Sequence, residues 1–364
     1  MRVGLLVYGS LETISGGYLY DRKLVDHLRR HGDEVSVVSL AWRNYARHLG
    51  DNLSPSLLNR LVHLPVDILL QDELNHPSLF RLNRRLRARV SYPIISIVHH
   101  LHSNEARPAW QNTIYRWIEN RYLSTVDGFV FNSQTTRSTV ESLVGAGRPS
   151  VVAYPAADRL CPDITDEQIA ERARQSGPFR IIFLGNVIPR KGLHTLLDAL
   201  EQLPENNWTL TVVGSLQVDK AYAWAMRRRA ARPDLAERVL FLGPVPDAVL
   251  IDKLGESHLL VVPSSYEGFG IVYLEGMGFG LPAIASTAGG SREIVTPGED
   301  GFLVSPGDST TLAQRLRELN EDRERLLTMS LNARRHYVSH LTWQKTAKHI
   351  RAFLQTVAER SSDA

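Results

Sequence analysis

Two glutamates, Glu267 and Glu275, stand on either side of a seven-residue segment that contains two glycines. An apolar run at 259–262 precedes this segment, so we expect Glu267 in a loop and Glu275 in the helix that follows. Gly268 and Gly270 leave the backbone open at the helix start, where unpaired N–H groups and the helix dipole attract an anion such as phosphate. Carboxylates beside a phosphate site are suited to binding sugar hydroxyls. The simpler alternative is that Glu267 only stabilises the helix start and that Glu275 is solvated.

A pair of cations, Arg190 and Lys191, lies at a second turn of this kind. The apolar strand at 180–184 runs into the glycine-containing segment 185–192, and leucines at helical spacing follow. Adjacent cations at a helix start oppose the positive end of the helix dipole, so an anionic ligand explains them better than stability does. A third glycine turn, at 287–293, also precedes a predicted helix start. One such turn is ordinary between a strand and a helix, but three in one region indicate a phosphate-bearing ligand.

The elements that must position these residues are short apolar strands that alternate with helical patterns. Such alternation is typical of parallel sheets covered by helices, so we predict an α/β chain with two doubly wound sheets. The stretch 154–178, with its turn residues and charged middle, is the expected connection between two domains. The predicted strands are 2–8, 35–40, 66–70, 93–98, 128–131, 151–153, 180–184, 208–213, 239–242, 258–262, 281–286 and 302–304.

With these motifs, the chain resembles the retaining glycosyltransferases of family 4, which have the two-domain GT-B fold. The resemblance is strong over roughly residues 178 to 310, and it rests on Arg190-Lys191-Gly192, the Glu267 to Glu275 spacing, Gly289-Gly290 and the segment 300–304. It implies two Rossmann-like, doubly wound parallel-sheet domains that face a cleft. The expected domains are an acceptor-binding one at 1–160, with a C-terminal helix at 341–358 that crosses back onto it, and a nucleotide-sugar-binding one at 178–340.

The resemblance also assigns roles to residues at matching positions. Glu275 is expected to bind the ribose hydroxyls and Glu267 the transferred sugar, while Arg190 with Lys191 is expected to bind the diphosphate. Asn186 departs from the family pattern, because arginine is common at that place, so one cation at the diphosphate would be missing. The other implied donor contacts come from the first glycine loop, the base-binding loop and the start of the Glu275 helix: Gly16, Gly17, Val245, Gly268, Phe269 and Gly270.

Histidines follow the predicted strand 93–98, at the edge where parallel sheets bind their ligands. The resemblance matches His99 to a histidine that touches the donor sugar and helps to align the acceptor, and it places His100 where an acidic residue is common. A purely structural role for His99 is the alternative. His102 lies nearby, but neighbours along a strand point to opposite faces, and no carboxylate pair completes a ligand set, so we predict no metal and no cofactor.

The function that these residues predict is a retaining, metal-independent glycosyltransferase that moves a hexose-type sugar from a nucleotide sugar. As the bond to the diphosphate breaks, Arg190, Lys191 and helix N–H groups would stabilise the growing charge more than they stabilise the ground state. A UDP-sugar is favoured and a GDP-sugar is the second option, and the acceptor is a lipid, a glycan or a small molecule. A nucleotide-sugar epimerase of the same fold and a catalytically silent nucleotide-sugar-binding protein stay open as alternatives.

Composition adds constraints of its own. With 364 residues and 43% hydrophobic content, the chain is long enough for two cores. A single cysteine, Cys161, forms no internal disulfide, which favours a reducing cytoplasm. The start, 1–8, is too short for the apolar region of a signal peptide and is predicted as a buried strand, and no run has the apolar length of a membrane span. The net charge of +3, without interleaved aromatic and basic residues, does not predict nucleic-acid binding.

Five arginines lie between Arg81 and Arg89, in a helix predicted to begin near Pro77. Each could gain on the order of 1 kcal/mol near an anionic lipid surface, so a second hypothesis is peripheral contact with the inner face of the membrane. The alternative is a solvated helix face, because the apolar residues of the same segment have the spacing of core contacts.

Overall fold

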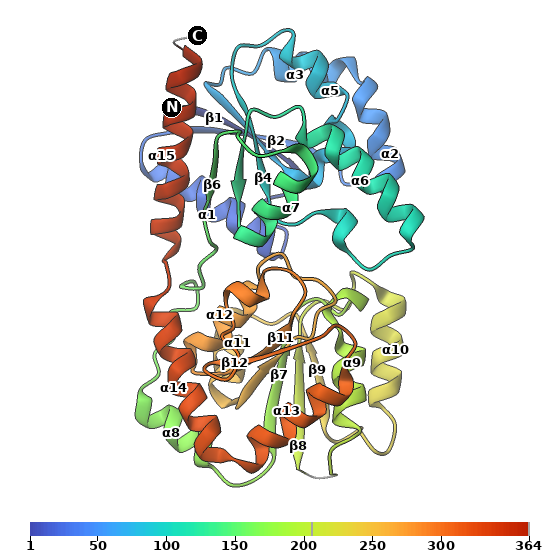
Figure 1. The fold of residues 1–364 in the computed structure, drawn as a ribbon, viewed down its shortest axis with the longest axis vertical. Coiled ribbons are helices and arrows are strands. Elements are labelled where there is room, and N and C mark those ends of the chain that lie inside the picture. The colour runs from blue at the N-terminus through green and yellow to red at the C-terminus, as the bar shows by residue number, and fades with distance from the viewer. Residues whose placement is uncertain (205–206, 363–364) are drawn as a thin grey trace. The chain divides into compact units, whose positions relative to one another are not determined.

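The computed structural model describes residues 1–204 and 207–362, and these form two compact units (Figure 1). Unit 1 contains Met1–Pro155 together with the segment that begins at Leu341, and unit 2 contains Ala156–His340. Each unit has its own six-stranded sheet, in which all neighbouring strands are parallel.

The sheet of unit 1 has the strand order β2-β1-β3-β4-β5-β6. Its inner strands are buried along almost their whole length, which explains why they are continuous apolar runs in the sequence. The strands are β1 (Arg2–Tyr8), β2 (Glu34–Leu40), β3 (Ile68–Asp72), β4 (Ile94–Val98), β5 (Gly128–Phe131) and β6 (Ser150–Val152).

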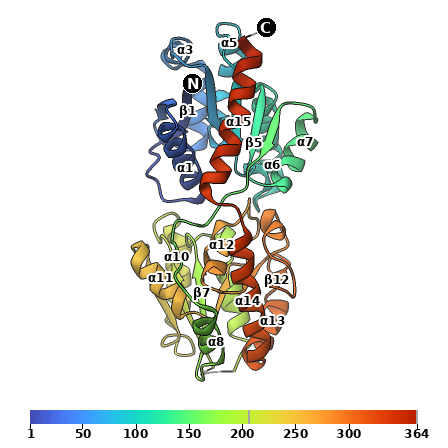
Figure 2. The ribbon, with the colours of Figure 1, turned by 90° about the vertical axis from the view of Figure 1, so that its left-hand side faces the viewer.

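Helices of very different lengths surround this sheet. The longest, α15 (Trp343–Ser362), packs on α1 and β6 (Figure 2). Arg351 Nε of α15 donates to Asp33 Oδ2 at 2.6 Å, and Thr346 Oγ1 donates to the Tyr154 carbonyl at 2.7 Å, so polar contacts fix the helix at both places. The others are α1 (Gly16–Arg30), α2 (Tyr45–Leu49), α3 (Pro55–Val62), α4 (His76–Leu79), α5 (Leu82–Arg87), α6 (Ala109–Leu123) and α7 (Gln134–Val144), with 3-10 helices η1 (Gly50–Leu53), η2 (Glu73–Asn75) and η3 (His102–Asn104).

The sheet of unit 2 has the order β12-β11-β10-β7-β8-β9. Its strands are β7 (Phe179–Leu184), β8 (Trp208–Val213), β9 (Val239–Gly243), β10 (Leu259–Val261), β11 (Ala283–Ser286) and β12 (Gly301–Val304). Its helices are α8 (Asp166–Arg174), α9 (Leu193–Leu200), α10 (Lys220–Ala230), α11 (Asp247–Glu256), α12 (Ile271–Gly278), α13 (Ser309–Glu321) and α14 (Arg323–Ser339), with 3-10 helices η4 (Pro189–Lys191) and η5 (Gly290–Glu293).

The predicted fold class is confirmed, because each of the twelve predicted strands corresponds to a strand of one of the two parallel sheets. The largest shift in position is in β3, predicted at 66–70 and observed at Ile68–Asp72. This shift matters for the chemistry, since it places Asp72 at the end of a buried strand. The stretch 154–178, predicted as a connection, contains helix α8, which is part of unit 2.

The prediction of one arginine-bearing helix from Pro77 through Arg89 is wrong. Two helices, α4 and α5, occupy this region, and α5 ends at Arg87. The cause is a side chain from elsewhere in unit 1: Asn52 Oδ1 accepts the backbone N–H groups of Arg81 at 2.8 Å and of Leu82 at 3.2 Å, so a new helix begins there. Leu82 and Leu86 are fully buried, as their spacing predicted.

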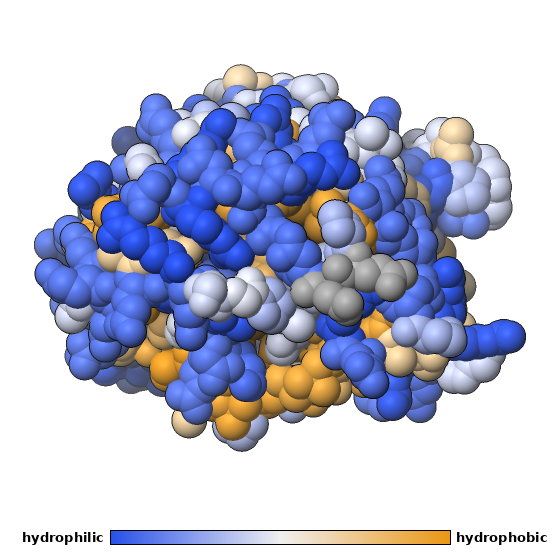
Figure 3. All heavy atoms as spheres, turned by 90° about the horizontal axis from the view of Figure 1, so that it is seen from below, coloured by the Kyte–Doolittle hydropathy of each residue, from blue (hydrophilic) through white to orange (hydrophobic). Residues whose placement is uncertain are grey.

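One face of the molecule, drawn in Figure 3, carries mainly hydrophilic residues, with hydrophobic ones in smaller areas between them. Among the helices of residues 1–204 and 207–362, none is both long enough and apolar enough to cross a membrane.

Candidate active site

Arg190 and Lys191 lie in η4, directly before α9, as the sequence predicted. Gly192 connects the two helices with φ of 73°, in the left-handed region that favours glycine. A Cβ at this position would lie only 2.2 Å from the carbonyl oxygen of Pro263, so the turn packs directly on the backbone that follows β10. The glycine thus brings the two cations to the loop that carries Glu267.

Glu267 is paired with these cations in a largely buried position. Its Oε2 lies 2.6 Å from Lys191 Nζ and 3.8 Å from Arg190 Nη1, and it also accepts a hydrogen bond from Ser264 Oγ at 3.2 Å. Burial alone would raise the pKa of Glu267, but Lys191 and Arg190 outweigh it and lower the pKa to about 2. Burial lowers the pKa of Lys191, and Glu267 offsets this only in part. Glu267 is therefore ionised at neutral pH and does not serve as a proton donor.

The third glycine turn supports the Glu267 loop by close backbone contact. The Gly290 N–H donates to the Glu267 carbonyl at 2.8 Å, and a Cβ at Gly289 would lie 2.0 Å from that oxygen. The turn leads into the short 3-10 helix η5. Its glycines are thus required by packing, whatever they bind.

The start of α12 is formed by Gly268, Phe269 and Gly270, and no side chain caps it. Gly270 has φ of 103°, and a Cβ there would lie 2.5 Å from the ring of Tyr273. The helix α11 also begins without a side-chain cap, whereas the Tyr222 hydroxyl accepts the His194 N–H in the first turn of α9 and aspartates cap α10, α13 and α14. Uncapped helix starts leave N–H groups for another partner, and an anion is the partner that the helix dipole favours.

Glu275 lies within α12, as predicted, but it is 4% exposed, so the alternative of a solvated glutamate is wrong. Its Oε1 lies 2.5 Å from Nε of Arg159, whose Nη1 donates to Asp247 Oδ1 at 2.7 Å. Burial raises the pKa of Glu275, and the charge of Arg159 offsets this only in part. Sequence reasoning missed Arg159, because the residue lies in the connecting stretch and 116 positions before its partner.

Asn186 and Val245 follow β7 and β9, two strands of the same sheet that are separated by β8. Asn186 follows β7 and is half-buried, and its carbonyl accepts the N–H of Ile188 at 2.9 Å. Val245 is half-buried in the loop between β9 and α11. Hydrogen bonds of the described residues do not join either one to the Lys191–Glu267 pair, so the structure brings together only part of the predicted donor set.

In unit 1, His99 meets the first glycine loop. Its Nε2 lies 3.4 Å from Asp21 Oδ1, and its ring contacts the Tyr20 ring at 5.2 Å between centroids. A Cβ at Gly17 would lie 3.1 Å from His99 Cδ2, so a bulkier residue there would crowd the imidazole. Gly16 and Gly17 form the first turn of α1. Burial alone would lower the pKa of His99, but Asp21 and other nearby carboxylates raise it.

Carboxyl groups that sequence reasoning missed lie buried near His99. Burial, with Asp21 nearby, raises the pKa of Asp72 to about 7. Burial likewise raises the pKa of Glu73 to about 8 and that of Glu119 to about 7. The acidic pair at 72–73 lies at the carboxyl end of the third strand, and this position at a sheet edge was the signal that could have revealed it.

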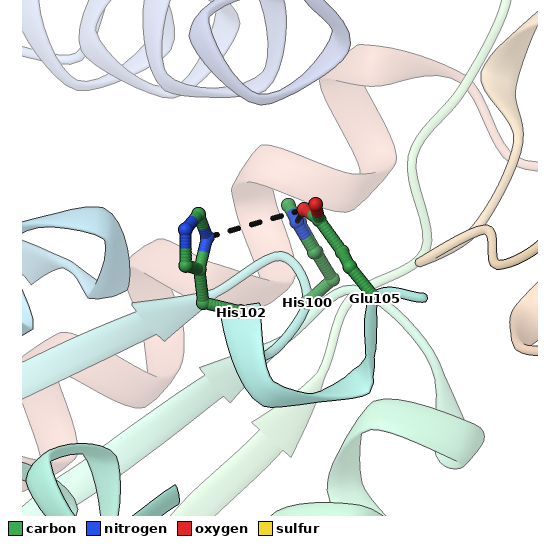
Figure 4. Close-up of side chains that lie close together, drawn as sticks. All are labelled: His100, His102 and Glu105. Carbon is green, nitrogen blue, oxygen red and sulfur yellow. Dashed lines mark hydrogen bonds and ion pairs between the residues drawn. The ribbon is translucent and has the colours of Figure 1, made fainter. Parts of the chain in front are cut away.

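His100 and His102 converge on Glu105 (Figure 4). His100 Nε2 lies 3.0 Å from Glu105 Oε1, His102 Nδ1 lies 3.9 Å from the same oxygen, and Arg107 Nη2 donates to Oε2 at 2.7 Å. The argument that no carboxylate pair completes a set with the histidines is wrong, because Asp21 and Asp72 lie with His99. Among the described residues, three groups have possible metal-ligand atoms within 4.8 Å of one another. They are His100, His102 and Glu105; Asp21, Asp72 and His99; and Glu73, His76 and Glu119.

These features define a class of protein: two parallel-sheet units of the GT-B fold, one of which holds a buried cation–carboxylate pair among uncapped helix starts. Comparison with known proteins agrees with this class. The chain matches the family model Glycosyl transferases group 1 over residues 164–336. It is 30% identical over 285 residues to D-rhamnosyltransferase WbpZ of Pseudomonas aeruginosa, a match that covers 71% of this chain and 72% of that protein. The chain belongs to the group 1 glycosyl transferase family.

Other similarities differ in how much they cover. Phosphatidyl-myo-inositol mannosyltransferase of Mycobacterium leprae is 26% identical over 100% of this chain and 98% of its own length. Glycogen synthase of Mycobacterium tuberculosis is 27% identical over 70% of this chain, and the match spans only 61% of that enzyme.

Solved structures of low sequence identity share the fold over nearly the whole chain. Sucrose-phosphate synthase from Thermosynechococcus elongatus has a TM-score of 0.83 at 20% identity, over 98% of both chains. Alr3699/HepE of Anabaena, in complex with UDP and glucose, has a TM-score of 0.75 at 22% identity, over 98% of this chain and 99% of that one.

Proposed function

We propose that this chain is a retaining, metal-independent glycosyltransferase that moves a hexose-type sugar from a nucleotide sugar to an acceptor. The observation that carries the proposal is the buried Lys191–Glu267 pair, at 2.6 Å, in a member of the group 1 family. A buried charge pair costs desolvation energy, and a hydrophobic pair of similar size would often be at least as stable. A ligand that uses both charges is the reason we give for keeping them.

The proposed donor site is built in unit 2. Lys191 and Arg190 bind the diphosphate, together with the uncapped start of α12, and Glu267 orients the hydroxyls of the transferred sugar. Glu275 binds the ribose hydroxyls, with its carboxylate held by Arg159. The loop that contains Val245 holds the base, and we favour a UDP-sugar over a GDP-sugar, since UDP is the nucleotide bound to the Anabaena protein of the same fold.

The proposed mechanism is electrostatic. When the bond between sugar and diphosphate breaks, negative charge grows on the diphosphate, and the fixed charge of Lys191 stabilises it more than it stabilises the intact donor. With a pKa of about 2, Glu267 stays ionised and supports positive charge at the anomeric carbon. The leaving diphosphate accepts the proton of the acceptor hydroxyl, which attacks on the same face, so the configuration is retained.

Metal independence follows from the same charges, since two cations at the diphosphate do the work of a divalent ion. Glu105, the carboxylate nearest to His100 and His102, already has a guanidinium partner in Arg107 at 2.7 Å. Burial lowers the pKa of His102 to about 3, so its ring is neutral at neutral pH. We assign this loop to contacts with the acceptor, and His99 to the alignment of the reacting groups.

The proposed acceptor binds to unit 1, and a lipid is the acceptor class we favour. The name of the Mycobacterium leprae relative includes phosphatidyl-myo-inositol, and that relative matches the whole chain. The arginines at 81–89 are exposed and fit peripheral contact with an anionic membrane surface. A water-soluble acceptor would instead leave them as a solvated surface.

The test of the proposed function uses the purified full chain and a panel of UDP- and GDP-sugars. Thermal shift identifies the nucleotide sugar that binds, and the assay then follows free sugar released without an acceptor, with and without EDTA. Release of the sugar with unchanged rate in EDTA supports the proposal. Interconversion of donor isomers would identify an epimerase, binding without turnover would identify a silent binding protein, and loss of turnover in EDTA would refute metal independence.

A further inference from the structure

A cavity of about 550 Å³ opens on unit 1, away from the residues assigned to transfer. It is lined by Arg84 and Arg87 of α5, by the loop from α6 to β5, and by Arg148 just before β6. These segments precede their strands, so the cavity lies at the edge of the sheet where strands begin. His99 and the glycine loop lie at the other edge, where strands end. The cavity therefore requires its own explanation.

The charge in this arginine pocket is strongly unbalanced. Three guanidiniums, those of Arg84, Arg87 and Arg148, line it together with a single carboxylate, that of Asp127. Arg87 Nη1 is paired with Asp127, which leaves two guanidiniums without a carboxylate in the pocket. Its other polar groups are the side chains of Ser124 and Thr125. A pocket with this lining does not suit an apolar ligand and attracts an anion.

Two of the arginines are held in place by the protein itself. Arg87 Nη1 donates to the Thr125 carbonyl at 3.1 Å, and Arg148 Nη1 donates to the Leu123 carbonyl at 3.3 Å. The Arg148 guanidinium also lies over the Phe129 ring, 5.8 Å from its centroid. Each of these contacts uses one terminal nitrogen of a group with five N–H donors, so a fork of donors stays available in a fixed position. Preorganised donors lose less entropy when they bind a ligand.

Arg84 completes the pocket without a partner of its own. Within residues 1–204 and 207–362 its side chain forms no hydrogen bond and no ion pair. Its neighbour Arg85 is different, because it does not line the pocket and its Nη1 donates to the Asn52 carbonyl at 3.2 Å. Stabilising contacts therefore explain Arg85, Arg87 and Arg148 in part, but they do not explain Arg84. Guanidinium groups that converge from separate segments match the oxygens of a phosphate group.

We propose that the arginine pocket binds a phosphate group, supplied either by a free phosphate compound or by the headgroup of an anionic lipid. Arg84 and Arg148 are the principal ligands, and Arg87, held by Asp127, borders the site. The proposal goes beyond sugar transfer, because it concerns a second anion site in unit 1 and holds whether or not unit 2 transfers a sugar.

The experiment compares two double variants that each remove two positive charges from unit 1. Arg84→Gln with Arg148→Gln changes the pocket, and Arg81→Gln with Arg89→Gln changes exposed arginines near the ends of α5 that do not line it. One arm titrates the full chain with inorganic phosphate, followed by ³¹P NMR line width. The other arm measures sedimentation with phosphatidylcholine vesicles that contain about 30 mol% phosphatidylglycerol at low salt.

We expect the pocket variant to bind phosphate, or the vesicles, about tenfold more weakly than the control variant. Loss in the phosphate arm alone identifies a free phosphate compound as the source, and loss in the vesicle arm identifies a lipid headgroup. Any phosphate site at Lys191 contributes equally to both variants. Equal binding by the two variants in both arms would overturn the proposal. If the pocket variant is poorly folded, Arg84→Gln alone replaces it, since the Arg84 side chain forms no hydrogen bond or ion pair with the described residues.

Discussion

Two buried carboxyl groups, one from each unit, have opposite acid–base properties. In unit 2, Glu267 has a pKa of about 2, because Lys191 and Arg190 outweigh the effect of burial. In unit 1, Glu73 has a pKa of about 8, because no cation close to it outweighs its burial. The comparison shows that burial alone does not decide whether a carboxyl group is ionised. Unit 2 keeps a fixed charge at neutral pH, while unit 1 holds protons that can leave within the physiological range.

The largest expected effect is that of Lys191→Ala, which would remove the nearer of the two cations that lower the pKa of Glu267. We expect turnover to fall by roughly 2 to 4 kcal/mol in barrier height, with a smaller change in the affinity for the free nucleoside. Steady-state kinetics and calorimetry measure the two effects. Adding Glu267→Gln to the variant controls for the carboxylate left unpaired by the first change. A Lys191→Ala enzyme with normal turnover would remove this residue from the mechanism.

The next effect is that of His99→Ala, which tests whether the titratable groups of unit 1 take part in transfer. We expect more than about a tenfold loss of transfer with nearly unchanged affinity for UDP or GDP, because we place His99 at the sugar and the acceptor. The matched control is His100→Ala, one residue further along and paired with Glu105 at 3.0 Å. If His100→Ala is the damaging change and His99→Ala is silent, the roles of the two histidines are reversed.

Glu275 lies between the two extremes, since Arg159 offsets its burial only in part. We expect Glu275→Ala to raise the donor KM with a smaller change in kcat, because ribose contacts change little during the reaction. Initial rates over a range of donor concentrations measure both constants. Asp247→Ala is a useful control, since it removes the other carboxylate on Arg159 and leaves Glu275 in place. A fall in kcat at constant donor affinity would contradict the ribose role.

The smallest expected effect is on stability as the pH changes. The pKa values of Glu73 and Glu119, about 8 and about 7, are above those of the unfolded chain, so folding is favoured most below about pH 4. The contribution of these two groups to stability is lost as the pH rises through their pKa values in the folded protein. We expect the Tm to fall between about pH 5 and pH 8, and to fall less in a Glu73→Gln/Glu119→Gln variant. If the Tm falls equally with pH in the two proteins, Glu73 and Glu119 are not the groups responsible.

The sequence predicted the fold well, because its information was local. Buried parallel strands must be continuous apolar runs, so their positions could be read directly, and β5 and β8 were predicted at their observed bounds. The same reasoning placed Glu267 in a loop and Glu275 in a helix. Periodicity and turn residues determine such features within a few positions of the chain.

The partners of the site residues could not be predicted in the same way, since they come from distant segments. Lys191 and Glu267 are 76 positions apart, and Arg159 lies 116 positions before Glu275. The start of α5 depends on Asn52, whose side chain reaches the backbone of Arg81 from 29 positions away. A local pattern contains no information about such contacts, so the sequence identified Lys191 and Glu267 without their contact, and it identified Glu275 without Arg159.

The route of the chain has a consequence for how the protein is made. Unit 1 is completed by α15, which packs on α1 and β6, whereas unit 2 is one continuous stretch, Ala156–His340. A ribosome therefore synthesises all of unit 2 before it synthesises α15, the helix that covers part of unit 1. During this interval α1 and β6 expose apolar surface that α15 later buries, and partly folded chains with such surface are the ones that need chaperones. Slow translation near residue 340 would lengthen this exposed stage.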